Sequence, residues 1–267
     1  MGRWFSQSKI NIMKKLLIIL LLIPLVSFGQ NKKKDTLSIL FVGNSFTYYY
    51  NLPQVVNAMS IYSDNYHLKT RHSIVPGSTL QEHLNQEQGT QTIDILNSES
   101  FDYVVLQHHS SATQKNLENL VNPKNKDSLF PFLKTSRKMV ELVKSKNAIP
   151  VFMMTWAYRA NPLMIETISS AYNNMSEKLE VDVVPCGILF DKARKFRPDL
   201  NLFHDNSHPS KNGTYLNGLA FYKYFTNEKT SNIPKQITTI DRNGEKLYLL
   251  LLSKENSDFL QNLVDEF

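Results

Sequence analysis

Ser38-Ile-Leu-Phe-Val-Gly-Asn-Ser-Phe-Thr47 is an apolar run that ends at Gly43 and is followed directly by a serine, Ser45. The run is rich in branched side chains and has the length of a buried strand. In open parallel sheets, functional loops lie beyond the carboxyl ends of the strands. The stretch therefore predicts a central strand with Ser45 at its functional end.

Apolar runs of strand length alternate with segments of helical spacing over most of the chain. Buried strands that alternate with helices indicate a parallel sheet covered on both faces. We therefore expect an α/β fold, a three-layer α/β/α sandwich with a mainly parallel five-stranded sheet. The expected strands are residues 37–42, 67–75, 101–106, 149–155 and 181–186, and the expected helices are residues 52–62, from 78, from about 127, 164–179, 188–194 and from 210.

The last segment, residues 234–267, departs from this alternation. Leu247 to Leu252 is strongly apolar and follows Arg242-Asn-Gly244, a turn signal. It predicts an added strand or hairpin, followed by a helix from Asn256. We see no internal repeat and no long linker, so residues 30–267 are expected to form one domain, with a core of about 37–225 and a C-terminal extension of about 234–267.

Residues 1–29 have the pattern of a signal peptide. Met13-Lys14-Lys15 precedes an apolar run, Leu16 to Val26, and the small-x-small site Ser27-Phe-Gly29 follows. We expect cleavage between Gly29 and Gln30, export to the periplasm or outside the cell, and no stable membrane insertion afterwards. The alternative is a membrane anchor, although the run is shorter than the ~20 apolar residues of a spanning helix. The true start, at Met1 or Met13, is left open.

Charge and cysteine content exclude further classes of protein. The formal net charge is +6, but four of the basic residues lie in residues 1–29, which leaves +2 for the remainder. The remaining basic residues are scattered, so no nucleic-acid partner is expected. Cys186 is the single cysteine, so an internal disulfide is impossible and a buried, inert thiol is expected. The oligomeric state has no signal in the sequence.

A second informative stretch, Asp205-Asn-Ser-His-Pro-Ser210, places an aspartate three residues before a histidine. Together with Ser45 it supplies a nucleophile, a base and a carboxylate that orients the base. The chain order Ser, Asp, His is that of α/β hydrolytic enzymes. The candidate catalytic residues are thus Ser45, Asp205 and His208. The structural alternative is that Ser45 only caps the helix that follows.

A metal site is the competing interpretation of the second stretch. His204 and His208 have the i, i+4 spacing of zinc-binding helices. Asn206, Ser207 and Pro209 disfavour a helix there, and no further ligand cluster has suitable spacing. We therefore expect no metal and no organic cofactor.

These motifs resemble those of the SGNH (GDSL-type) hydrolase superfamily. Gly43-Asn44-Ser45 is similar to its Gly-Asp-Ser block, and Asp205, His208 and Pro209 match its last block fully. The resemblance implies a flavodoxin-like fold and a serine esterase. It also implies an oxyanion hole that includes the amides of Ser45 and of Gly77, although Gly77 could simply be a turn glycine.

The third block departs from the family. The superfamily has Gly-x-Asn-Asp, whereas this chain has Val104-Val-Leu-Gln-His-His-Ser-Ser111. Gln107 carries the same amide on a longer arm, so we expect it to be the third oxyanion donor, with a purely structural amide as the alternative. The chain thus resembles a divergent branch of the superfamily.

The substrate is weakly encoded. Tyr48, within Tyr48-Tyr-Tyr50, and Trp156 are candidate aromatic walls for a sugar ring, and His108 is a candidate pocket residue. The resemblance and the predicted export favour removal of small acyl groups, acetyl above all, from carbohydrate. A lipid or lysophospholipid esterase and a non-catalytic glycan-binding protein are the alternatives.

Overall fold

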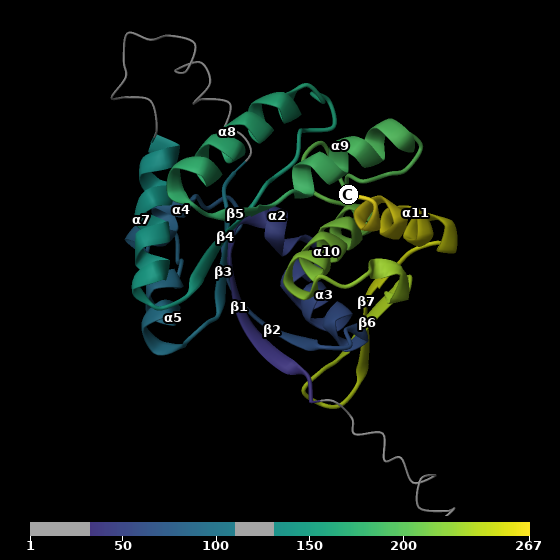
Figure 1. Ribbon diagram of the computed structural model, residues 1–267, viewed down its shortest axis with the longest axis horizontal. Helices are drawn as coiled ribbons and strands as arrows, with labels where there is room; N and C mark the ends of the chain where they lie inside the picture. Colours follow the sequence, from purple (N-terminus) through teal and green to yellow (C-terminus); the bar gives the residue numbers. More distant parts are fainter. Residues whose placement is uncertain (1–32, 110–130) are drawn as a thin grey trace, which may run out of the picture. The chain divides into compact units, whose positions relative to one another are not determined.

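Five parallel strands form the central sheet of the computed structural model, which describes residues 33–109 and 131–267. They are β1 (Asp35–Gly43), β2 (Tyr66–Ile74), β3 (Tyr103–Gln107), β4 (Ile149–Met153) and β5 (Asp182–Val184). The strand order is β2-β1-β3-β4-β5 (Figure 1), which is the doubly wound, flavodoxin-like arrangement. The predicted fold class is confirmed.

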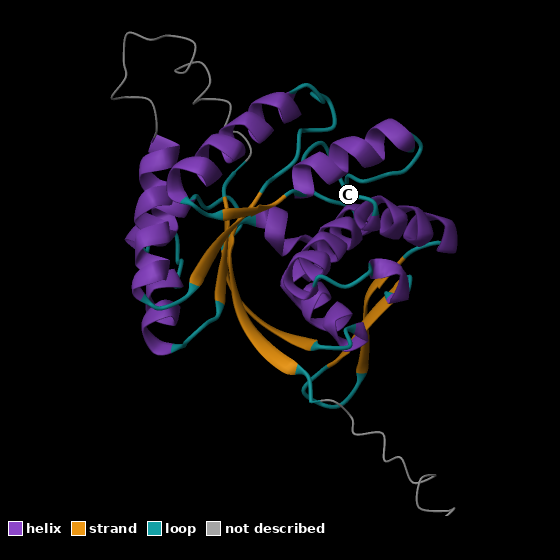
Figure 2. Ribbon diagram, in the orientation of Figure 1, coloured by secondary structure: helices purple, strands orange, loops and turns teal. Residues whose placement is uncertain are grey.

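Helices cover both faces of the sheet (Figure 2). One face is covered by α4 (Leu80–Asn85), α5 (Thr92–Ser98), α7 (Pro131–Ser145) and α8 (Met164–Leu179). The other is covered by α3 (Leu52–Met59), α9 (Cys186–Phe196), α10 (Lys211–Thr226) and α11 (Lys254–Asp265). The short helices α2 (Ser45–Tyr48), η2 (Tyr49–Asn51), η3 (Ser60–Tyr62) and η4 (Thr230–Asn232) complete the described elements.

The alternation of side chains along β1 explains its continuous apolar run. Ile39 and Phe41 pack into the core on the α10 side, whereas Leu40 and Val42 pack into the core on the α7 side. All four are fully buried. Because successive strand residues point to opposite faces, a strand covered on both sides needs apolar residues at every position.

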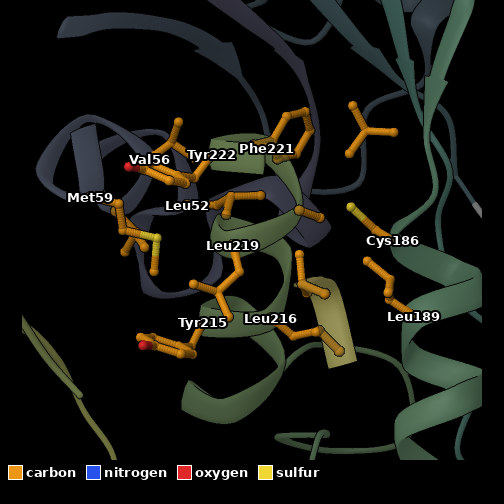
Figure 3. Close-up of a cluster of buried hydrophobic side chains, with 14 of the residues drawn as sticks. Leu52, Val56, Met59, Cys186, Leu189, Tyr215, Leu216, Leu219, Phe221 and Tyr222 are labelled. Carbon is orange, nitrogen blue, oxygen red and sulfur yellow. The ribbon is translucent and has the colours of Figure 1, made fainter. Parts of the chain in front are cut away.

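The core on the α10 side lies between α10, α3 and α9 (Figure 3). Leu52 and Val56 of α3 belong to it, as do Leu216 and Leu219 of α10. Cys186 begins α9 in the same cluster and is fully buried, as expected from the sequence. Burial raises the pKa of its thiol, so the thiol is inert at neutral pH.

The C-terminal segment forms a hairpin and a helix. Strands β6 (Gln236–Ile240) and β7 (Lys246–Leu251) pair antiparallel in a separate two-stranded sheet. Ser253 caps α11 by accepting a hydrogen bond from the Asn256 amide. The hairpin is fixed to α3 by a 3.0 Å hydrogen bond from Gln54 to Thr239.

Two sequence expectations need correction. The helical stretch expected from Ser78 onward is two helices, α4 and α5, because the chain turns at Gln86, Gln88 and Gly89, all with positive φ. The helix expected from about Asp127 is described only from Pro131, since residues 110–130 lie outside the described residues.

The predicted signal peptide, residues 1–29, also lies outside the described residues. The part that the structure describes from Lys34 onward belongs to one compact unit. Within the described ranges, none of the helices has the length and apolar character needed to cross a bilayer.

Candidate active site

The turn after β1 presents Ser45 at the start of α2. Asn44 is the residue that caps this helix: its side-chain oxygen accepts from the Phe46 amide at 3.1 Å, and its side-chain nitrogen donates to the Ser78 carbonyl at 3.0 Å. Asn44 is fully buried, whereas Ser45 is partly exposed. The capping role that the sequence allowed for Ser45 therefore belongs to Asn44.

His208 and Asp205 lie in one tight loop between α9 and α10. An isolated bridge between Phe203 and Pro209 closes the loop, and the His204 amide donates to the His208 carbonyl at 2.8 Å. The carboxylate of Asp205 accepts from the amides of Ser207 at 2.7 Å and His208 at 2.8 Å. The loop is thus built around the aspartate side chain.

The fold brings Ser45, His208 and Asp205 into one hydrogen-bonded chain. His208 Nε2 lies 2.9 Å from Ser45 Oγ, and His208 Nδ1 lies 2.7 Å from Asp205 Oδ2. An ionised carboxylate can only accept, so Nδ1 carries the proton and Nε2 is the free acceptor for the serine hydroxyl. This is the tautomer that a general base requires.

The ionisation of Asp205 is set by its own loop. Partial desolvation works to raise its pKa, but hydrogen bonds from the amides of His208 and Ser207 and from the His208 ring outweigh it. The pKa of Asp205 is therefore held well below its usual value. The carboxylate stays ionised at neutral pH and can stabilise a cationic His208.

Two aromatic rings pack against the His208 imidazole. Tyr49 stacks on it with ring centroids 4.2 Å apart and planes 13° apart, and Phe46 lies 5.7 Å away. The sequence analysis named the run Tyr48-Tyr-Tyr50 but did not single out Tyr49. Its place in that aromatic run, directly after the helix that begins at Ser45, was the available signal.

Two backbone amides are available as oxyanion donors. Among the described residues, no group accepts a hydrogen bond from the amide of Ser45 or of Gly77. Gly77 has φ +79° and is exposed, so its backbone adopts the left-handed conformation that favours glycine. The carbonyl of the next residue, Ser78, accepts a hydrogen bond from the Asn44 side chain, which connects this turn to the Gly43–Ser45 turn, called the nucleophile turn below.

A buried histidine, which the sequence did not reveal, joins the same two turns. His83 of α4 lies 3.0 Å from the Gly43 carbonyl and 2.9 Å from Ser78 Oγ through Nε2, and 2.7 Å from Thr92 Oγ1 through Nδ1. Burial lowers its pKa, with smaller opposing contributions from the Gly43 carbonyl and Glu82. The neutral ring is thus a fixed support under the Gly43–Ser45 turn.

Gln107 does not have the geometry expected of an oxyanion donor. Its side-chain oxygen accepts from the Asn44 amide at 2.9 Å and from Thr47 Oγ1 at 2.9 Å, and its nitrogen donates to the His108 carbonyl at 2.7 Å. A backbone amide can only donate, which fixes the oxygen toward Asn44. Gln107 is 1% exposed, and its amide supports the turn that carries Ser45.

Gly43 is needed for this arrangement. A Cβ at position 43 would overlap the side-chain oxygen of Gln107. The glycine that ends β1 thus allows the close approach of Gln107 to the nucleophile turn.

Two candidate substrate contacts are also corrected. Trp156 is fully buried, stacks on Phe190 at 4.4 Å and donates from Nε1 to the Ser207 carbonyl at 2.8 Å. His108 is 4% exposed and hydrogen-bonds Ser136 at 2.8 Å, and burial lowers its pKa to about 3. Both side chains are internal supports, and Trp156 holds the loop that carries His208.

Tyr48 remains at the surface, with 59% of its area exposed, and lines a groove beside the nucleophile turn. His109 is half-buried and its ring lies 5.5 Å from Phe46. Burial and the nearby His208 lower the pKa of His109.

The zinc interpretation of His204 and His208 fails on local geometry. Residues 204–208 form a bridged turn and no helix, so the i, i+4 spacing does not place the two rings side by side on one helix face. Both nitrogens of His208 already face Ser45 and Asp205. Across residues 33–109 and 131–267, no cluster of three or more His, Cys, Asp or Glu side chains is arranged to hold a metal.

The fold is similar to the folds of solved structures that include a candidate SGNH hydrolase. A candidate SGNH hydrolase from Slackia heliotrinireducens is similar with a TM-score of 0.57 and 22% identity, over 72% of this chain and 100% of that protein. A DUF4886 family protein from Bacteroides uniformis is similar with a TM-score of 0.63 and 16% identity, over 87% and 94%.

Axe2, an acetylxylan esterase from Geobacillus stearothermophilus, is similar with a TM-score of 0.53 and 16% identity, over 72% of this chain and 95% of that protein. No protein-family model matches the chain, and no curated protein matches it. At these identities the likenesses establish the fold, so the activity has to be argued from the site.

Proposed function

We propose that this chain is an exported serine esterase that hydrolyses small acyl esters, acetyl esters of carbohydrate above all. The observation that carries the proposal is the hydrogen-bonded chain from Ser45 through His208 to Asp205, with distances of 2.9 and 2.7 Å. A nucleophile, a base and an orienting group at such distances are the signature of an activated serine. The candidate SGNH hydrolase and the acetylxylan esterase among the similar structures support the same class of reaction.

In the proposed reaction, Ser45 Oγ attacks the ester carbonyl carbon while its proton passes to His208 Nε2. The negative charge on the carbonyl oxygen is stabilised by the amides of Ser45 and Gly77, and each such donor typically contributes ~3 kcal/mol. When the tetrahedral intermediate collapses, the alcohol leaves with the proton from His208, and the acyl group stays on Ser45. Water then attacks the acyl-enzyme, His208 takes its proton, and the acid leaves as Ser45 regains a proton.

Hydrolysis of p-nitrophenyl acetate by the wild type and Ser45→Ala tests the chemistry. We expect Ser45→Ala and His208→Ala to lose activity by several orders of magnitude and to lose labelling by a fluorophosphonate, with unchanged melting temperatures. Ser98→Ala is the matched control, because Ser98 is an exposed serine that precedes β3 and so lies near the amino-terminal ends of the strands, away from Ser45.

Full activity in Ser45→Ala would end the proposal. Activity that EDTA removes and zinc restores would favour a metal at His204 and His208. Binding of glycans without hydrolysis of any ester would favour the glycan-binding alternative.

Export is the second part of the proposal, and it is supported by the pattern of residues 13–29. N-terminal sequencing of periplasmic or secreted protein should give Gln30 as the first residue. An intact Leu16–Val26 segment in the membrane fraction would show an anchor instead.

A further inference from the structure

A groove of about 370 Å³ lies beside the nucleophile turn and is not used by the triad. Tyr48 and Tyr50 line it from the α2–η2 segment, His72 and Ile74 from the edge strand β2, and Tyr248 from the C-terminal hairpin. Pockets for small molecules have volumes of roughly 300–1,000 Å³. An acetyl group would fill only a small part of this volume, so the groove has room for another part of the substrate.

The residues that line the groove are neighbours of the site. Ile74 pairs with Gly43, the residue that ends β1 two positions before Ser45. Tyr50 contacts the ring of Tyr49 edge-on, with centroids 6.5 Å apart, and Tyr49 stacks on the His208 ring. Two rings, those of Tyr50 and Tyr49, thus connect a molecule in the groove to the His208 ring.

The backbone beneath the groove is strained. Tyr50 has φ +52° and Asn51 has φ +51°, so two consecutive residues other than glycine adopt the left-handed conformation. This conformation is tolerated by asparagine but is unfavourable for tyrosine. Strain of this kind is concentrated at ligand-binding and catalytic positions. Here it turns the chain from α2 into α3 and leaves the Tyr50 side chain at the groove.

The lining combines aromatic faces with hydrogen-bonding groups. Tyr48 is 59% and Tyr248 66% exposed. Lys246 Nζ lies over one face of the Tyr248 ring, 5.7 Å from its centroid, so the other face of Tyr248 and the Tyr48 ring are available for contact. Asn51 and His72 add polar groups between them. Burial, with the Arg71 charge, lowers the pKa of His72, so its neutral ring can donate and accept at pH 7. A ring with apolar faces and hydroxyl edges matches this lining, whereas an alkyl chain would leave the polar groups without partners.

We propose that this groove binds the sugar units next to the esterified unit of an oligosaccharide, with Tyr48 and Tyr248 as stacking platforms. The inference rests on the proposed esterase function and adds a subsite to it. The hairpin that supplies Tyr248 is anchored, because Leu250 is 1% exposed and Gln54 binds Thr239 at 3.0 Å. The C-terminal extension is therefore a specificity element of the site.

The test compares esters of different chain length. Chemically acetylated one-unit and four-unit oligosaccharides of glucose, xylose and N-acetylglucosamine are assayed for acetate release, alongside p-nitrophenyl acetate. In the wild type we expect kcat/KM for the four-unit ester of one of these backbones to exceed that of its one-unit ester at least tenfold. In Tyr248→Ala and Tyr48→Ala this ratio should fall at least fivefold. Tyr62→Ala, at the end of η3 and 42% exposed, is the matched control and should keep the wild-type ratio.

The failures of the two proposals are distinguishable. If p-nitrophenyl acetate hydrolysis does not depend on Ser45, the esterase function fails. If it does depend on Ser45 but no backbone shows a chain-length preference, or the tyrosine variants keep the wild-type ratio, the subsite is wrong and the esterase function stands. A preference for p-nitrophenyl decanoate over acetate that Tyr248→Ala removes would show that the groove binds an acyl chain, which also overturns the subsite.

Discussion

Replacement of Gln107 by alanine should lower the stability of the protein as well as its kcat for ester hydrolysis. The substitution leaves the Asn44 amide without its acceptor at 2.9 Å and removes one acceptor of Thr47. A buried polar group that loses its partner costs about 1–3 kcal/mol. The loss of the Thr47 hydrogen bond should cost less free energy than the loss of the Asn44 hydrogen bond, because the Thr47 hydroxyl also lies 3.8 Å from Met153 Sδ. We expect the free energy of unfolding to fall by about 2–4 kcal/mol, which corresponds to a fall in melting temperature of roughly 4–16 °C.

Thermal unfolding and kinetics of the same variants separate this support role from that of an oxyanion donor. Loosening of the Asn44 turn should displace Ser45, so kcat should fall together with stability. An oxyanion donor would instead lower kcat by roughly 10²–10³-fold with no loss of stability. That second result, an unchanged melting temperature with a much lower kcat, would refute the support role.

Gln107→Glu gives a second readout. Burial should raise the pKa of the glutamate above its unfolded value of about 4.3. The protonated acid can accept from Asn44 and donate to the His108 carbonyl, as the amide does. Because the folded pKa is the higher one, the stability of this variant relative to the wild type should be greatest below about pH 4 and should fall as the pH rises. A deficit relative to the wild type that grows as the pH falls would contradict the geometry.

Three further outcomes follow from the described contacts. Asp205→Asn should lower kcat/KM by about 10³–10⁴-fold, because the amide no longer holds His208 in its tautomer; wild-type kinetics would contradict the role. Trp156→Phe should keep the core contact with Phe190 but release the Ser207 carbonyl, so kcat should fall more than KM changes, with the melting temperature as control. His108 stays neutral down to about pH 3 when folded, whereas its unfolded form protonates near 6.5. Between these two values the unfolded state binds more protons than the folded state, so the free energy of unfolding should fall as the pH falls, by about 1.4 kcal/mol per pH unit from this group. Urea unfolding at pH 7 and pH 5 should therefore show a smaller loss of stability in His108→Gln than in the wild type.

The sequence was informative where pattern and chemistry act locally. Continuous apolar runs predict strands buried on both faces, and β1, β3 and β4 occur where such runs were found. The mixed segment at residues 67–75 forms β2, an edge strand that is only partly buried. The Arg242-Asn-Gly244 turn signal, followed by an apolar segment, predicted the hairpin, because it too is a local pattern. The serine and the Asp-x-x-His pair were predicted as a site because together they supply a nucleophile, a base and an orienting carboxylate in the chain order of α/β hydrolytic enzymes.

The errors concern the direction of side chains. Gln107 was placed correctly at the end of β3, but its amide is taken up by the Asn44 amide, 63 residues earlier in the chain. Trp156 was placed correctly after β4, but its ring packs inward and binds a carbonyl 51 residues later. Position follows from the local pattern, whereas direction depends on which distant group lacks a partner, and a single sequence does not contain that information.

The placement of acid and base in one loop has a mechanical consequence. Asp205 and His208 are three residues apart, whereas Ser45 and His208 are 163 residues apart. Of the two hydrogen bonds in this chain, the one between Ser45 and His208 joins distant parts of the sequence, whereas the one between His208 and Asp205 lies within a single loop. Local opening of the fold between Ser45 and His208 would separate the nucleophile from the base and leave the His208–Asp205 pair intact.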